Sequence, residues 1–113
     1  MSSREIWYVK SWQVLPDRVE EHEALQQRIW SASSERFPEM RGKLRYFFEK
    51  DGSEEIRHLV FTGFTELDQY KSIEKRSEED PCLAGLFEKF YPLTVPGSAK
   101  KLVWVDGVTW EEE

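Results

Sequence analysis

Bulky apolar side chains stand next to one another in three predicted strands. The adjacent residues are Phe47–Phe48, Val60–Phe61 and Val103–Trp104–Val105. Neighbouring residues of a strand point to opposite faces of a sheet, so both faces of this sheet carry apolar bulk. The helices of so short a chain can cover only one face. We therefore predict that a second copy covers the other, in a homodimer formed through the sheet faces.

The periodicity and the turn residues divide the chain into four strands and three helical segments. Runs rich in aromatic and β-branched residues predict strands at 6–14, 43–50, 56–64 and 100–106. Asp17, followed three residues later by Glu20, predicts the start of a helix that runs to about Arg36. A second helix is predicted to begin with a cap at Thr65, and Asp80–Pro81 separates it from a short third segment.

The resulting order, β-α-β-β-α-β, is that of the ferredoxin-like fold. The predicted fold class is α+β, with an antiparallel four-stranded sheet and helices on one face. Residues 1–113 are interpreted as a single domain of this kind.

In element order, length and aromatic strands, residues 5–106 resemble the dimeric α/β-barrel superfamily. This group includes antibiotic-biosynthesis monooxygenases, haem-degrading monooxygenases, NIPSNAP-like and EthD-like proteins, and muconolactone isomerases. The resemblance implies a homodimer whose sheets form a joint barrel, with a ligand pocket between helices and sheet. The monooxygenase branches typically use an asparagine in the pocket, and this sequence has none. An oxygenase built on this chain would need another polar group, such as Gln26 or Gln13.

Composition narrows the classes of partner. The net charge of −6 at pH 7 and the lack of a long basic cluster exclude nucleic acid as an expected partner. No apolar run approaches the length of a membrane span, so no membrane partner is expected. A single cysteine, Cys82, excludes an intrachain disulfide and favours the cytoplasm. Cys82 itself is interpreted as a buried, structural residue.

The first predicted helix carries the best candidates for chemistry. His22, Gln26 and Ser33 fall inside its apolar arc, where polar groups are costly unless they are hydrogen-bonded or line a cavity. In one reading, His22 is a catalytic base or donor, Gln26 and Ser33 orient a ligand, and Trp30 or Tyr8 forms a wall. In the other, His22 is a buried histidine hydrogen-bonded to a nearby carboxylate.

The other histidine, His58, lies in the third predicted strand on the same face as Val60 and Phe64. It is a further candidate for ligand contact, or a surface or interface residue. The sequence has no HExxH or CxxC motif, so we expect neither a metal nor another cofactor.

Three functions stay open at this point. The first is a cofactor-independent monooxygenase or isomerase acting on a small planar apolar substrate. The second is a non-catalytic barrel that binds a small aromatic or apolar ligand or serves in stress. The third is an interaction module that docks a protein partner. A fold of this kind does not by itself decide among the three.

Overall fold

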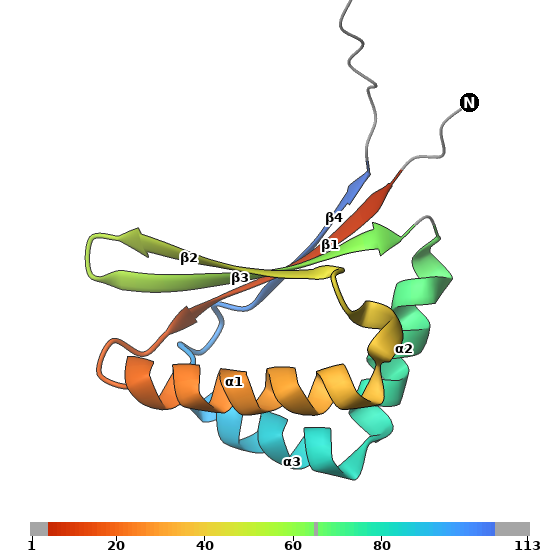
Figure 1. Cartoon of the computed structure of the whole chain (residues 1–113). Coiled ribbons are helices and arrows are strands. Elements are labelled where there is room, and N and C mark those ends of the chain that lie inside the picture. Colours follow the sequence, from red (N-terminus) through yellow and green to blue (C-terminus); the bar gives the residue numbers. More distant parts are fainter. Residues whose placement is uncertain (1–4, 65, 106–113) are drawn as a thin grey trace, which may run out of the picture.

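The computed structural model describes residues 5–64 and 66–105, in which four antiparallel strands form one sheet with the helices on one side of it (Figure 1). The strands are β1 (Ile6–Val14), β2 (Leu44–Asp51), β3 (Glu54–Phe64) and β4 (Lys100–Val105). The helices are α1 (Val19–Arg36), α2 (Leu67–Glu79) and α3 (Pro81–Phe90), with short 3-10 turns at Pro38–Met40 and Tyr91–Leu93. The strand order β2-β3-β1-β4 confirms the predicted ferredoxin-like class.

The helices cover one sheet face with a two-part apolar core. One part gathers around Trp12 of β1 and Ile29 of α1, and reaches Phe90 of α3. The other gathers around Tyr8 of β1 and Leu83 of α3, which is fully buried. Residues of β1 alternate between this face and the open one, as the pleat requires.

A bulge near the end of β3 breaks the expected alternation. Ile6 pairs with Phe64, whereas Tyr8 pairs with Phe61, so the β3 side of this pairing has an extra residue. Gly63 lies in the bulge with φ of +78°, a conformation that favours glycine. The bulge turns Phe64 into the helix-side core, against the ring of Tyr8. The expectation that Phe64 shares a face with His58 is therefore wrong.

The helix starts differ in part from the sequence signals. α1 begins after Arg18, which makes no side-chain capping bond, so Asp17 and Glu20 do not form the predicted start. α2 begins with a capping box between Glu66 and Gln69, and the predicted cap, Thr65, lies outside the described residues. Asp106, predicted as the last residue of β4, lies outside them too.

Asp80 separates α2 from α3, as predicted, and also caps α3. Its Oδ1 accepts hydrogen bonds from the backbone N–H groups of Cys82 and Leu83, at 3.0 and 3.1 Å. This geometry turns the side chain of Leu83 into the core and that of Cys82, in the same first turn, toward solvent. Cys82 is exposed, so the expectation of a buried cysteine is wrong.

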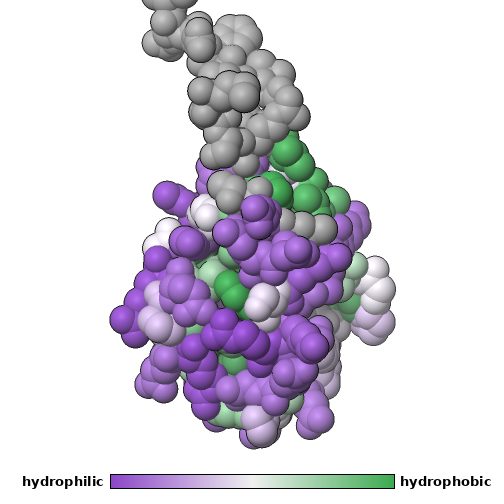
Figure 2. Space-filling model, turned by 90° about the vertical axis from the view of Figure 1, so that its right-hand side faces the viewer, coloured by the Kyte–Doolittle hydropathy of each residue, from purple (hydrophilic) through white to green (hydrophobic). Residues whose placement is uncertain are grey.

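The helix-free sheet face exposes large apolar side chains. Trp7, Phe47, Leu102 and Trp104 keep between 39% and 51% of their surface exposed. Their strand partners place them on the face opposite to Tyr8 and Trp12. Figure 2 shows hydrophobic side chains toward the end of the molecule where the strands project, above a largely hydrophilic helical part. The described residues thus leave an apolar face uncovered.

Candidate functional site

A cavity of about 410 Å³ lies between the helices and the sheet. This volume is in the range of small-molecule sites. Its walls are mainly apolar and aromatic, and include Ile29, Trp30, Leu59, Phe61, Phe87 and Phe90. Residues of α1, α2 and α3 form one side, and residues of all four strands form the other.

The cavity brings together three of the residues predicted from the first helix. Gln26, Trp30 and Ser33 follow one another along α1, and all three line the cavity. Gln26 is only 6% exposed. Its carboxamide makes no hydrogen bond to any residue in the described part of the chain. The amide borders the cavity and is not fully enclosed, since the Tyr8 hydroxyl is the one fully enclosed side-chain atom without a partner in the described part of the chain. Gln26 therefore offers a donor and an acceptor to whatever fills the cavity.

His22 lies beside the cavity and does not line it. Its side chain is fully buried, and the ring sits 4.6 Å from that of Phe90, which is a lining residue. The indole N–H of Trp12 donates to Nε2 of His22 at 2.9 Å, and Nδ1 is 2.9 Å from Oε1 of Glu23. An Nε2 that accepts a hydrogen bond requires the proton to sit on Nδ1, which then donates to Glu23.

This geometry fixes the charge state of His22. Burial lowers its pKa, the neighbouring Arg57 lowers it further, and Glu23 opposes both effects. A second proton on Nε2 would face the indole N–H of Trp12, donor against donor. The imidazole is therefore held neutral in a single tautomer. This arrangement has the features of the second reading of His22, a buried histidine hydrogen-bonded to a carboxylate.

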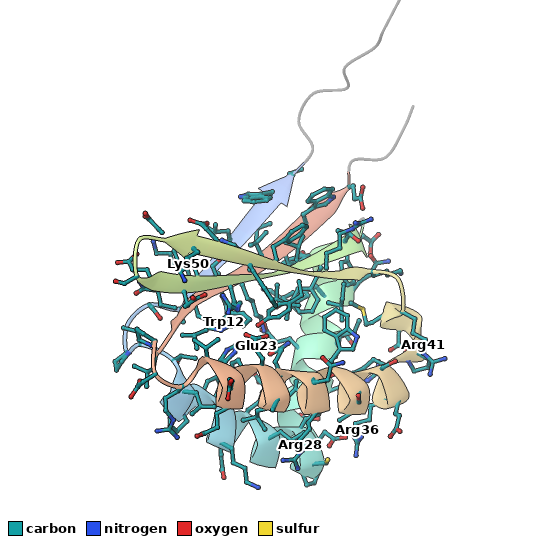
Figure 3. The ribbon with its side chains drawn as sticks, turned by 60° about the vertical axis from the view of Figure 1, so that its left-hand side comes forward. Trp12, Glu23, Arg28, Arg36, Arg41 and Lys50 are labelled. Atoms are coloured by element: carbon teal, nitrogen blue, oxygen red, sulfur yellow. The ribbon has the colours of Figure 1, made fainter. Side chains whose placement is uncertain are left out.

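Glu23 joins His22 to a charged network between α1 and the sheet. Its Oε1 accepts from Nε of Arg57 at 2.8 Å and from the Tyr46 hydroxyl at 3.2 Å. Arg57 is only 2% exposed and also donates to Glu55 at 3.2 Å. Trp12 and Glu23 lie in the space between sheet and α1, whereas Arg28 points away from it (Figure 3). This network was not predicted from the sequence.

Neither Tyr8 nor His58 lines the cavity. Tyr8 is buried and stacks on Tyr70 of α2, with ring centroids 4.0 Å apart. His58 lies on the open sheet face, where Nδ1 is 2.7 Å from the Ser11 hydroxyl and Nε2 is 2.8 Å from a carboxylate oxygen of Glu49. Among the predicted site residues, therefore, Gln26, Trp30 and Ser33 line the cavity, whereas His22, Tyr8 and His58 do not.

Sequence reasoning missed a polar group in the cavity that joins β1 to α2. Lys10, Glu74 and Tyr70 all line it. Nζ of Lys10 is 3.4 Å from Oε2 of Glu74, and the Tyr70 hydroxyl donates to the same oxygen at 2.9 Å. Burial lowers the pKa of Lys10, and Lys101 adds to this effect, while Glu74 opposes it. Lys10 is the one charged residue of β1, and it falls on the helix-facing side. A charge at that position in the strand was the sequence feature that could have revealed this group.

The described residues contain no cluster of His, Cys, Asp or Glu that could hold a metal ion. Within residues 5–64 and 66–105, no helix has the length and apolar character needed to cross a membrane.

No protein-family model and no curated protein matches this sequence. Solved structures do match it. A NIPSNAP family protein of unknown function from Agrobacterium tumefaciens aligns with a TM-score of 0.73, at 14% identity over 94% of this chain and 91% of that one. A dimeric ferredoxin-like protein from an uncultured marine organism aligns with a TM-score of 0.64, at 12% identity over 99% and 95%. A mutant of SnoaB, a cofactor-independent oxygenase from Streptomyces nogalater, aligns with a TM-score of 0.52, at 14% identity over 96% and 98%.

The chain has the fold of the NIPSNAP family proteins. It shares this ferredoxin-like fold with proteins of the antibiotic biosynthesis monooxygenase type, as the sequence resemblance implied. In this NIPSNAP-like fold, the cavity and the open apolar face lie on opposite sides of the sheet. A ligand in the cavity and a protein on the open face would therefore not compete for the same surface.

Proposed function

We propose that this protein is a homodimer that binds a small, planar, mostly apolar ligand in the helix–sheet cavity of each protomer. The observation that carries the proposal is Gln26, a largely buried residue whose amide borders the cavity and has no hydrogen-bond partner among the described residues. Its donor and acceptor are therefore available to a ligand or a water in the cavity.

The walls support the choice of ligand class. Trp30, Phe61 and Phe87 offer flat apolar surfaces, which favour a planar ring. Gln26 and Ser33 lie along one helix and would pair with a carbonyl or hydroxyl on that ring. The cavity volume of about 410 Å³ accommodates a one- or two-ring compound.

The dimer rests on the exposed sheet face. Trp7, Phe47 and Trp104 would leave water on contact with the same face of a second copy, at a gain of about 25 cal/mol for each Å² of apolar surface buried. The dimeric ferredoxin-like protein of similar fold supports the formation of a dimer. The cytoplasm is the proposed location, on the evidence of the single cysteine.

Catalysis is the second candidate function, favoured by the fold shared with a cofactor-independent oxygenase. In an oxygenase or isomerase reaction, Gln26 and Ser33 would hold the substrate's carbonyl or enolate, with Trp30 as a wall. His22 could serve as the base only if Trp12 released Nε2, because both imidazole nitrogens are bonded in this structure.

A titration with 1-naphthol, a planar apolar ring with one hydroxyl, tests the proposal. We expect saturable binding by calorimetry, and about fivefold weaker binding in Gln26→Leu, the loss expected for one hydrogen bond. The matched control is Gln27→Leu, because Gln27 is exposed on the same helix. Equal binding by the two variants, or no saturable binding by the wild type, would contradict the proposal. Oxygen uptake with 1-naphthol would establish the catalytic alternative.

A further inference from the structure

Lys10 has an unusual position for a lysine in the middle of a central strand. β1 pairs with β3 on one side and β4 on the other, and Lys10 lies opposite Leu59 and Lys101. Its side chain points to the helix side, where only 32% of it stays exposed. Nζ lies 5.7 and 5.8 Å from the ring centroids of Phe61 and Tyr70. An amine is thus held in an aromatic wall of the cavity.

We propose that Lys10 is a nucleophilic amine that forms an imine with an apolar aldehyde or ketone bound in the cavity. This inference rests on the proposed ligand-binding function and names the class of ligand. Its basis is the convergence of an amine, a carboxylate and a phenol, Lys10, Glu74 and Tyr70, on a cavity with apolar walls. A desolvated lysine beside a second cation is a recurrent way to prepare such a nucleophile.

Imine formation needs no reagent beyond the lysine and the carbonyl compound. The lone pair of neutral Nζ attacks the carbonyl carbon, a C–N bond forms, and a proton passes from nitrogen to oxygen to give a carbinolamine. The C–O bond then breaks, and the oxygen leaves as water after taking one more proton. The product is a protonated imine on Lys10, and no atom is oxidised or reduced overall.

Glu74 and Tyr70 stand where these protons must move. Oε2 of Glu74 is 3.4 Å from Nζ of Lys10, within reach of the proton that the nitrogen gives up. The Tyr70 hydroxyl donates to the same oxygen at 2.9 Å, and burial and Glu74 raise its pKa, so it keeps its proton and positions Glu74 through this hydrogen bond. Glu74 therefore accepts the proton from the nitrogen and, once protonated, can give it to the leaving oxygen.

The charges that face Lys10 come from two elements, α2 and β4. Glu74 and Glu78 of α2 raise the pKa of the amine, Lys101 of β4 lowers it, and burial lowers it most. The net direction is downward, so a larger fraction of Lys10 is neutral near pH 7 than of an exposed lysine. Lys101 reaches the same Glu74 oxygen at 3.5 Å and competes with Lys10 for it.

Reductive trapping with benzaldehyde and cyanoborohydride near neutral pH tests this inference. Each imine becomes a stable benzyl amine, which peptide mass spectrometry assigns to a lysine. We expect Lys10 to be labelled about tenfold faster than Lys71, an exposed lysine of α2, because it has more neutral amine and a binding site for the ring. The Lys10→Met variant should lose the fast-labelled site, and Lys71→Met should keep it.

Benzyl alcohol, which has no carbonyl, separates this inference from the proposed function. Shifts of cavity resonances in NMR spectra with benzyl alcohol, together with fast labelling of Lys10, support both. Binding of benzyl alcohol with labelling of Lys10 no faster than that of Lys71 overturns the imine and leaves the binding cavity. If benzyl alcohol does not bind and labelling is spread evenly over the lysines, both proposals are wrong.

Discussion

Replacing Glu23 by alanine should destabilise the fold more than any other single change on the surface of α1. The carboxylate is 29% exposed, yet it accepts hydrogen bonds from three partners in the layer beneath it. Removing it leaves the guanidinium of Arg57, 3% exposed at the side chain, with Glu55 as its one remaining carboxylate. It also takes away the acceptor that holds the proton of His22 on Nδ1.

The size of the loss follows from these contacts. Breaking a buried ion pair by removing one partner costs about 3–5 kcal/mol. Arg57 keeps its contact with Glu55 at 3.2 Å, and the lost carboxylate was partly solvated, so the lower end applies. We expect Glu23→Ala to lower the free energy of unfolding by about 3 kcal/mol.

Urea denaturation followed by circular dichroism measures this loss, with Glu20→Ala as the control. Glu20 is exposed three residues earlier on the same helix, and its removal should change stability by no more than about 0.5 kcal/mol. A loss below about 1 kcal/mol in Glu23→Ala would show that the network is no stronger than an exposed ion pair and would refute the reasoning.

Two further predictions concern His22 and the open sheet face. Because the folded pKa of His22 lies below its usual 6.5, the unfolded state takes up the proton first, so wild-type stability should be complete above about pH 6.5 and fall as the pH drops below it. In His22→Gln the free energy of unfolding, measured by urea denaturation at a series of pH values, should no longer show this fall below about pH 6.5. An unchanged pH dependence in the variant would contradict the prediction. Trp104→Asp, which puts a charge on the open face, should yield monomers by light scattering. Val103→Asp, on the other face at similar exposure, should stay dimeric, and equal behaviour of the two variants would argue against dimerisation through the sheet.

The strands and their order could be predicted because the apolar pattern was strong. β1 has the predicted bounds, Ile6–Val14, and the other strands shift by at most two residues at the ends that the structure describes. The helix starts were harder, since Asp17 has the right residue type for a cap but the chain turns into α1 only after Arg18. The bulge at Gly63 was not predicted either, because a single extra residue in a strand produces no periodic pattern in the sequence.

Only the part of the candidate site that lies on one helix, α1, could be predicted from the sequence. The helical period placed Gln26, Trp30 and Ser33 together, and the structure shows all three on the cavity. The same period included His22, but its surroundings depend on Trp12 from a strand, which no pattern within the helix reveals. The prediction that Cys82 is buried was wrong for a similar reason. The cap at Asp80 sets the rotation of α3, so that Leu83 points inward in place of Cys82.

Arg57 and Lys10 both point from the sheet toward the helices, and the tightness of their contacts separates their roles. Arg57 is buried, with Glu23 at 2.8 Å, Glu55 at 3.2 Å and the ring centroid of Phe48 at 4.3 Å from the guanidinium. Lys10 meets its one carboxylate, Glu74, only at 3.4 Å and borders a cavity of about 410 Å³. A charge held by short hydrogen bonds is committed to the fold, whereas a loosely paired charge that borders an apolar cavity is free to react or bind. On this basis Arg57 belongs to the framework of the protein, and Lys10 belongs to its chemistry.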